Sequence, residues 1–209
     1  MTGKFIVFEG IDGSGKSTQF KLFCNMLRER GHEVVETREP TREPIGDLIS
    51  RRLKMKTDLP SHLNGLVYTL LFYADRVEHN NMIERELEKG KIVVSDRYYH
   101  STLAYQQTQG FDTDFILDLH KKLVEKGYVK KPDTTFLVDL PAETAIKRID
   151  SREKDKVHIF EHTEFLKRLR ENYLGLKKLL NEKIIAVEGS GSVEEVHQRL
   201  LNKCPLWKS

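Results

Sequence analysis

Residues 10–17 read Gly-Ile-Asp-Gly-Ser-Gly-Lys-Ser and fit the pattern G-x-x-x-x-G-K-[S/T] at every fixed position. Glycines at such positions let backbone N–H groups turn inward around phosphate oxygens. The lysine reaches the β- and γ-phosphates of a nucleotide, and the hydroxyl that follows is a Mg²⁺ ligand. We therefore predict a phosphate-binding loop made of Gly10, Asp12, Gly13, Ser14, Gly15, Lys16, Ser17 and Thr18, with Lys16 catalytic and Ser17 on the metal.

The flanking sequence supports this prediction. An apolar run at 5–8 comes before the loop and a helical pattern at 16–30 follows it, and a helix N-terminus adds partial positive charge for an anion. Such a loop serves kinases, GTPases and motor ATPases alike. The Asn-Lys-x-Asp element usual in guanine-specific proteins is absent from the sequence, and the chain has only 209 residues. Both observations favour a small-molecule kinase.

A second group of polar residues follows the third apolar run, where the chain reads Ser95-Asp96-Arg97-Tyr98. Asp96 at the end of a strand is placed to hold the shell of a Mg²⁺ ion or to orient Arg97. An arginine there can clamp an acceptor phosphate bidentately. The polar loop at 37–44 follows the second run and lies where ligands bind in open α/β sheets.

The elements that must position these groups alternate along the chain. Short runs rich in β-branched and aromatic residues predict buried parallel strands, and the segments between them carry helical patterns. We predict an α/β fold, a five-stranded parallel sheet with helices on both faces. The strands are expected at 5–8, 33–36, 92–95, 135–138 and 184–187. Helices are expected at 16–30, at 60–88 as two helices, from Pro141, at 163–180, and at 192–201 with a capping box.

Composition excludes several classes of protein. Hydrophobic residues make up 38% and charged residues 32%, with a net charge of only +3, so a nucleic-acid polymer is not the expected partner. The two cysteines have no metal-ligand spacing, which favours a reducing, cytoplasmic compartment. The most apolar stretch, 65–74, is too short to span a bilayer. We expect a single domain over residues 1–209 with no membrane partner.

Taken together, the motifs resemble the thymidylate kinase family of nucleoside monophosphate kinases. They occur in the family's order across nearly the whole chain: Phe8-Glu9-Gly10 leading into the phosphate-binding loop, Thr37-Arg38-Glu39-Pro40, Leu71-Phe72-Tyr73-Ala74-Asp75-Arg76, Asp96-Arg97-Tyr98, Ser101-Thr102-Leu103-Ala104-Tyr105-Gln106 and Lys131-Pro132-Asp133. The resemblance implies the P-loop fold of these kinases with a short lid at about residues 150–160. It also implies a homodimer that transfers the γ-phosphoryl group of ATP, with Mg²⁺, to dTMP for dTTP synthesis.

The resemblance also implies roles around the base and sugar of the acceptor. Phe72 would stack on the thymine ring. Arg76 would donate to the base edge and so favour a carbonyl of thymine over the amino group of cytosine. Ser101 or Thr102 would reach the other base-edge groups, and Tyr105 would crowd the sugar 2′ position and favour deoxyribose.

Around the acceptor phosphate, the resemblance assigns Arg97 together with Arg38 or Arg42. In the family the arginine that meets this phosphate follows the proline of the loop, which favours Arg42. Asp12 would lie between the two nucleotides and position the acceptor phosphate, and Glu9 would orient a water on Mg²⁺.

The charged run at 150–158 is expected to be a lid that closes over ATP and excludes water. Some family members carry a catalytic cation in the phosphate-binding loop, at the position of Gly13 here, and others carry it in the lid, where Arg152 is the candidate. The usual Asp-Arg pair of the lid is Asp-Lys at 155–156, and lysine does not replace arginine at a bidentate site. The lid residue that meets the phosphoryl group is therefore open between Arg152, Lys154 and Lys156. Arg148 resembles the family arginine that stacks on adenine.

Two other functions stay open on the sequence. One is a kinase of the same fold with another acceptor, a deoxynucleoside or a different monophosphate, although Arg42 and Arg97 argue for an acceptor that already carries phosphate. The other is a catalytically silent nucleotide-binding subunit, which only the departures in the lid support.

Overall fold

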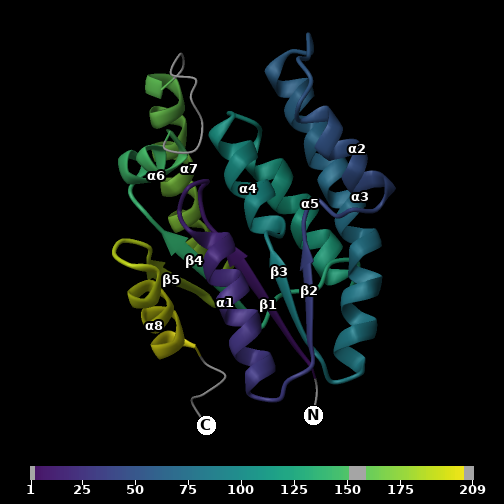
Figure 1. Cartoon of the computed structure of the whole chain (residues 1–209). Helices are drawn as coiled ribbons and strands as arrows, with labels where there is room; N and C mark the ends of the chain where they lie inside the picture. The colour runs from purple at the N-terminus through teal and green to yellow at the C-terminus, as the bar shows by residue number, and fades with distance from the viewer. Residues whose placement is uncertain (1–2, 151–158, 205–209) are drawn as a thin grey trace.

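The computed structural model describes residues 3–150 and 159–204 of the chain. Its centre is a five-stranded sheet in the order β2-β3-β1-β4-β5, in which every pairing is parallel (Figure 1). This confirms the predicted α/β fold, and each predicted run lies in or overlaps a strand. The strands are β1 (Lys4–Glu9), β2 (Val34–Arg38), β3 (Ile92–Asp96), β4 (Thr134–Asp139) and β5 (Ile184–Glu188).

Side chains of β1 alternate between two hydrophobic cores, one on each face of the sheet. Phe5 and Val7 belong to one core, and Ile6 and Phe8 belong to the other. All four are buried, as expected for a parallel strand with helices on both sides. The strand therefore reads as a continuous apolar run rather than as an alternating one.

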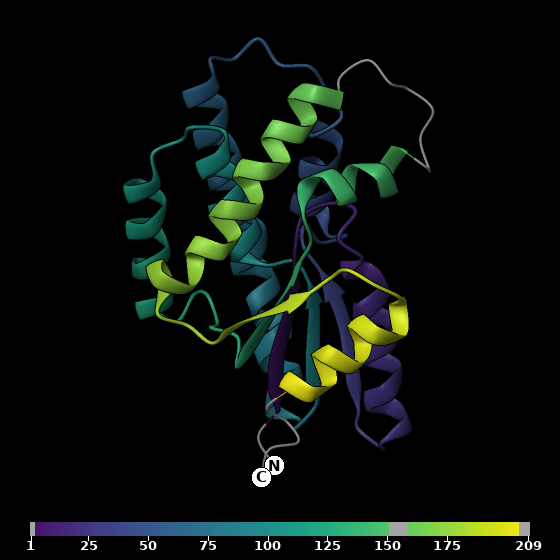
Figure 2. The same cartoon turned by 90° about the vertical axis from the view of Figure 1, so that its left-hand side faces the viewer.

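The helices form one layer on each face (Figure 2). Helices α1 (Lys16–Glu29) and α8 (Val193–Lys203) pack against the core that contains Phe8. The core on the opposite face takes residues from α3 (Ser61–Glu88), α4 (Tyr99–Thr108), α5 (Thr113–Glu125), α6 (Ala142–Asp150) and α7 (Ile159–Leu180). The short α2 (Pro44–Arg52) packs against α3.

The carboxyl ends of β1, β2 and β3 meet at one edge of the sheet. Phe8 is in register with Asp96, and Asp96 is in register with Arg38. The three loops that leave these strands carry the phosphate-binding pattern, Arg97, and the segment after Arg38. The register therefore brings together the chemistry that the sequence predicted, at the edge where ligands bind in such sheets.

The segment at 60–88 forms one helix, not the two that the sequence predicted. Helix α3 has 28 residues and contains no proline. Gly65, its weakest helix former, serves packing instead: a Cβ atom there would lie 2.8 Å from the ring of Phe111. The glycine thus admits a neighbouring aromatic ring without ending the helix.

The predicted capping box of the last helix is confirmed, with Ser192 and Glu195 bonded to each other's backbone N–H groups. Two helices, α2 and α5, were not among the predicted helices. Within the described residues, none of the helices combines the length and the hydropathy that crossing a membrane requires.

Candidate active site

The phosphate-binding loop follows β1 directly and ends where α1 begins. Gly13 and Gly15 adopt left-handed backbone angles, with φ of 78° and 92°, which side-chain-bearing residues rarely adopt. A Cβ atom on Gly13 would lie only 2.5 Å from the carbonyl oxygen of Ala145 in α6. Position 13 therefore has no room for a cationic side chain in this arrangement.

Lys16 points to the end of β3, where its Nζ forms an ion pair with Oδ1 of Asp96. Burial lowers the pKa of Lys16, the nearby Arg97 lowers it further, and Asp96 acts in the opposite direction. The Ser17 hydroxyl lies 3.2 Å from Oδ2 of the same aspartate. The lysine, the hydroxyl and the carboxylate thus form one polar cluster at the start of α1.

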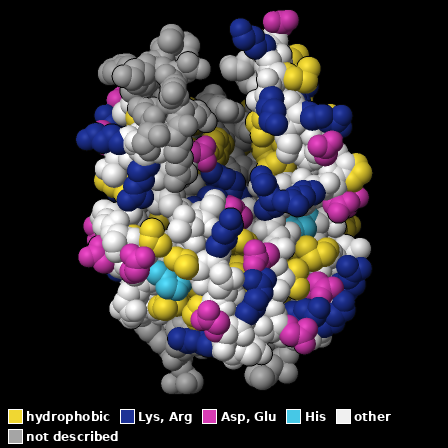
Figure 3. Space-filling model, in the orientation of Figure 1, with side chains coloured by type: hydrophobic (Ala, Val, Ile, Leu, Met, Phe, Trp, Pro, Cys, Tyr) yellow, Lys and Arg dark blue, Asp and Glu magenta, His cyan; other side chains and the backbone are white. Residues whose placement is uncertain are grey.

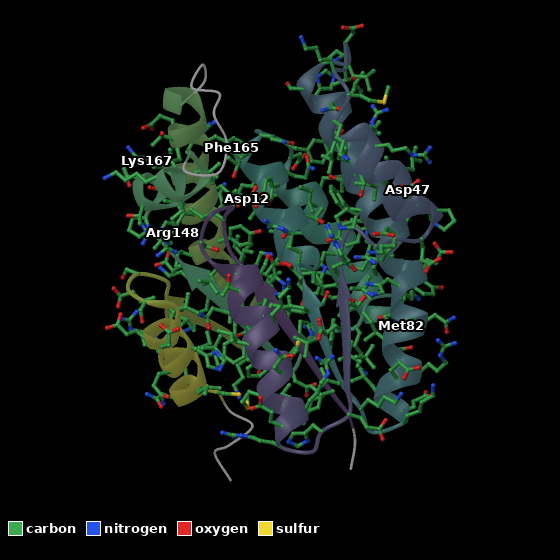
Figure 4. All side chains as sticks on the ribbon, in the orientation of Figure 1. Asp12, Asp47, Met82, Arg148, Phe165 and Lys167 are labelled. Atoms are coloured by element: carbon green, nitrogen blue, oxygen red, sulfur yellow. The ribbon has the colours of Figure 1, made fainter. Side chains whose placement is uncertain are left out.

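A cavity of about 380 Å³ opens along this loop and ends at the turn after β5. Arg148 crosses it, with Nη1 3.4 Å from the Ser14 carbonyl oxygen and Nη2 3.3 Å from that of Gly189. Val193 and Val196 of α8 supply an apolar wall. Figure 4 shows Asp12 on the loop beside α1 and Arg148 on the side of α6. We call this space the donor cavity.

A second cavity, of about 290 Å³, lies on the other side of Asp12. We call it the acceptor cavity. It unites most of the residues predicted to hold an acceptor, although they come from α3, the end of β3 and α4. Its wall includes Asp12, Pro40, Tyr68, Phe72, Arg76, Arg97, Ser101, Thr102 and Tyr105.

Arg76 is fully buried in the wall of the acceptor cavity. Its Nε and Nη2 donate to Oε2 of Glu39 at 2.9 and 2.5 Å, and Nη2 also donates to Thr102 Oγ1 at 3.1 Å. Burial acts to lower the pKa of Arg76, but the Glu39 carboxylate outweighs it and the pKa is raised. Nη1 has no hydrogen-bond partner among the described residues. A buried N–H group of this kind calls for an acceptor.

Arg97 and Asp12 join the donor and acceptor cavities. Nη2 of Arg97 donates to Oδ1 of Asp12 at 2.6 Å, and the Tyr105 hydroxyl donates to Oδ2 at 3.3 Å. Burial is the main reason why the pKa of Tyr105 rises to about 12, so its hydroxyl keeps the proton. Asp12 lines both cavities, which is the position expected for a residue between two substrates.

Glu9 is the last residue of β1, directly before the phosphate-binding loop. It is fully buried, and its carboxylate accepts from Tyr98 N, Ser101 N, Ser101 Oγ and Tyr173 Oη at 2.8, 3.2, 2.7 and 3.1 Å. A carboxylate offers about four lone-pair positions, and these donors take them. Glu9 therefore holds the start of α4, and its contact with a metal-bound water stays a prediction.

Ser101 lines the acceptor cavity and belongs to the same hydrogen-bond network as Glu9. Its hydroxyl contacts Glu9, Arg97 and Tyr173. Of the two residues considered for the base edge, Thr102 is the one whose hydroxyl contacts Arg76 in the wall of the acceptor cavity. This contact favours Thr102 for the predicted role.

Arg38 and Arg42 line a third cavity of about 670 Å³, together with Ser17 and Asp96. Glu39 and Pro40 belong to the acceptor cavity, so the segment after β2 divides the two spaces. Figure 3 shows Lys and Arg side chains around the hollow of this face. Both arginines lie on the side of the site where Ser17 and Asp96 are, and the preference for Arg42 stays a prediction.

Arg152, Lys154 and Lys156 lie outside the described residues, so the predicted roles of the lid remain predictions. Conversely, the structure adds Glu39, His79 and Tyr173 to the site's supporting network. Glu39 belongs to a motif noted in the sequence. Tyr173 lies in the helix predicted at 163–180, and nothing in the sequence indicated the contact of its hydroxyl with Arg97.

This geometry defines the class of protein. A loop built for polyphosphate opens on one side of Asp12 and Arg97, and a smaller cavity with aromatic walls opens on the other. The site belongs to a kinase that brings two substrates together for phosphoryl transfer.

Comparison with known proteins identifies the family. The family model described as thymidylate kinase matches residues 8–200 of the chain. A probable thymidylate kinase of Thermococcus kodakarensis is 42% identical over 203 residues, covering 94% of this chain and 95% of the relative. One of Methanocaldococcus jannaschii is 39% identical over 197 residues, covering 94% and 93%. The crystal structure of thymidylate kinase from Ehrlichia chaffeensis matches with a TM-score of 0.74 and 29% identity, covering 97% of this chain and 98% of that one. The chain belongs to the thymidylate kinase family, as its motifs indicated.

Proposed function

We propose that this protein transfers the γ-phosphoryl group of Mg-ATP to dTMP, giving dTDP and ADP for dTTP synthesis. One observation carries the proposal: Asp12 and its partner Arg97 stand between a phosphate-binding donor cavity and an acceptor cavity whose wall holds Phe72 and Arg76. The named activity of the relatives supports the choice of acceptor.

The donor cavity suits ATP. Backbone N–H groups of the loop and the first turn of α1 face the phosphates, and Lys16 carries the positive charge that they need. Arg148 and the apolar wall of Val193 and Val196 border the far end of the cavity, where we place adenine.

The residues present also fit Mg²⁺. This ion binds through one or two protein oxygens together with substrate phosphates and waters. The Ser17 hydroxyl and the Asp96 carboxylate are oxygen donors 3.2 Å apart beside the loop. When bound there, Mg²⁺ would neutralise charge on the phosphates. Asp96 and Ser17 would hold the metal, and Lys16, which pairs with Asp96 in this structure, would carry positive charge to the phosphates.

The acceptor cavity suits a thymine base. Phe72 offers a ring for stacking, and Arg76 donates to a base carbonyl through Nη1, which has no hydrogen-bond partner in the described part of the chain. Cytosine places an amino group where thymine has its O4, and two donors would then face each other. Thr102 supports the same edge through Arg76, and Tyr105 borders the sugar and disfavours a 2′-hydroxyl.

The acceptor phosphate is held by Arg97 and by Arg42 rather than Arg38, with Asp12 aligning it toward the donor. Phosphoryl transfer depends mostly on positioning and on neutralising charge. Lys16 and Arg97 supply charge from the described part of the site. Arg152 of the lid supplies a further cation, with Lys154 and Lys156 as the alternatives.

We also propose a cytoplasmic homodimer that has neither a nucleic-acid nor a membrane partner. The apolar side chains of α3 at positions 63, 67, 70, 74 and 77 recur at the four- and three-residue spacing typical of a helix–helix seam. Leu63, Leu70 and Val77 of this seam are 42%, 50% and 38% exposed. A second copy of α3 is the partner that such a seam fits.

A coupled ADP-release assay with Mg-ATP tests the proposed reaction against dTMP, dUMP, dCMP, dGMP, the ribose analogue of dTMP, and thymidine. Strong preference for dTMP is expected. Preference for thymidine would move the protein to the nucleoside kinases and remove the roles of Arg42 and Arg97. No turnover with any acceptor would leave only nucleotide binding.

A further inference from the structure

The guanidinium of Arg97 is held by hydroxyl groups on the side away from the substrates. Its Nη1 donates to Ser101 Oγ and Tyr173 Oη, both at 3.1 Å, and to the Gly10 carbonyl oxygen at 3.3 Å. The backbone of Arg97 adopts a left-handed conformation with φ of 73°, which is uncommon outside glycine. The side chain is thus directed by its neighbours and not by a regular strand or helix.

Tyr173 of α7 is the most distant of these neighbours in sequence. Its side chain is only 2% exposed, and its hydroxyl lies 2.8 Å from Ser101 Oγ and donates to Oε2 of Glu9 at 3.1 Å. Burial, and next Glu9, hold the pKa of Tyr173 well above its ordinary value. The hydroxyl therefore keeps its proton for Glu9 while its lone pair accepts from Arg97.

Glu9 anchors this chain of contacts to the sheet. It ends β1, immediately before the phosphate-binding loop, and it is fully buried. Its other oxygen accepts from the backbone N–H groups of Tyr98 and Ser101 at the start of α4. Strand β1, helix α4 and helix α7 therefore meet at a single carboxylate, one hydroxyl away from Arg97.

We propose that Tyr173 is a positioning residue for phosphoryl transfer: its hydroxyl, fixed by Glu9, sets the direction in which Arg97 presents Nη2 to Asp12 and to the acceptor phosphate. The proposal rests on the phosphate-binding role proposed for Arg97. Tyr173 acts only through that arginine, because it lines neither the donor nor the acceptor cavity.

Tyr173→Phe keeps the ring and removes the hydroxyl. We expect kcat/KM for dTMP to fall about tenfold, the effect of losing one buried hydrogen bond to a charged group, with KM for ATP unchanged. Tyr99→Phe is the matched control: Tyr99 is also fully buried and its hydroxyl donates to a carboxylate, Glu182, at 2.6 Å. That control is expected to lose stability and keep its kinetics with dTMP.

A double-mutant cycle separates positioning from general support of the fold. In an Arg97→Ala background, Tyr173→Phe is expected to cause no further loss of kcat/KM, since the residue that it directs is gone. An equal tenfold loss in both backgrounds would overturn the proposal, as would wild-type kinetics for Tyr173→Phe. If Tyr173→Phe does not fold, Ser101→Ala removes the other hydroxyl on Nη1 and is judged by the same cycle.

Arg97→Ala alone tests the role on which the proposal rests. A large loss with dTMP and little change in ATP binding is expected. If Arg97→Ala keeps wild-type use of dTMP, the proposed phosphate contact is wrong. If it loses dTMP while Tyr173→Phe does not, only the positioning role of Tyr173 is wrong.

Discussion

Arg76 and Glu39 form a buried ion pair in which two guanidinium nitrogens donate to the same carboxylate oxygen, at 2.9 and 2.5 Å. The other oxygen lies 3.1 Å from Nδ1 of His79. The pair leaves Nη1 of Arg76 as the nitrogen without a partner among the described residues. Glu39 thus fixes the orientation of the guanidinium in the wall of the acceptor cavity.

Glu39→Gln should lower both stability and the use of dTMP. The amide keeps the shape of the side chain but leaves the buried Arg76 charge without its counterion, a loss of about 3–5 kcal/mol for pairs of this kind. Urea unfolding measures the first effect and kcat/KM for dTMP the second. Asp47→Asn is the control, because the Asp47–Arg51 pair is exposed and contributes little. Equal stability of the two variants would contradict the account.

Lys16→Ala should abolish nearly all turnover, because it removes the cation nearest the transferring phosphates. Single-turnover assays with Mg-ATP and dTMP measure the loss. Lys122→Ala, at an exposed pair with Asp118 on α5, should behave as wild type. Substantial activity in Lys16→Ala would argue against the assigned donor cavity.

Phe72→Ala should raise KM for dTMP and leave KM for ATP unchanged. Stacking between a base and an aromatic side chain is worth about 1–3 kcal/mol, and Phe72 lines only the acceptor side of the site. Steady-state kinetics with each substrate varied in turn measures both constants. A parallel rise in both would mean that the substitution disturbs the fold and not one contact.

His120 should make the fold less stable in mild acid. Burial lowers its pKa to about 3, and Glu182 opposes this effect only in part. The pKa of a histidine in an unfolded chain is about 6.5. Between these two pKa values the unfolded chain binds a proton that the folded chain does not. The contribution of His120 to stability is therefore complete above about pH 6.5 and decreases as the pH falls. At pH 5 the loss is about 2 kcal/mol. Unfolding of the wild type and His120→Gln at pH 5 and 7 measures it, and the same pH dependence in both would refute the assignment.

Leu70→Glu should separate the proposed dimer into monomers, because it places a charge in the centre of the exposed seam of α3. Sedimentation analysis measures the mass. Leu179→Glu changes a similarly exposed leucine on α7 and should leave the dimer intact. A wild-type protein that sediments as a monomer would rule out the seam as a dimer interface.

Local sequence patterns were sufficient to predict the strands and the phosphate-binding loop. Each strand contains a short apolar run, only two residues long in β2, and the loop depends on residues that are neighbours in the chain. Helix α4 shows why the start of an element can be hard to predict from local sequence. Its N-cap residue, Tyr98, makes no side-chain capping bond, and the carboxylate of Glu9 from β1 meets the N–H groups at its start.

The supporting contacts of the site were hidden for the same reason. From the sequence, Glu9 was predicted to orient a water on the metal. Only the fold shows the four hydrogen-bond donors around its carboxylate. The contact between Tyr173 and Arg97 joins α7 to the end of β3, and no local pattern connects such distant segments. Residue type and spacing predict which groups are present, but the partners of a buried group depend on packing.

The close approach of Gly13 to Ala145 also limits which side chains the phosphate-binding loop can carry. An arginine at position 13 would bring its Cβ against the backbone of α6, so that substitution alone cannot add a cation to the loop of this chain. The addition needs α6 to be displaced at the same time. An engineered Gly13→Arg variant should therefore lose activity unless α6 is redesigned with it.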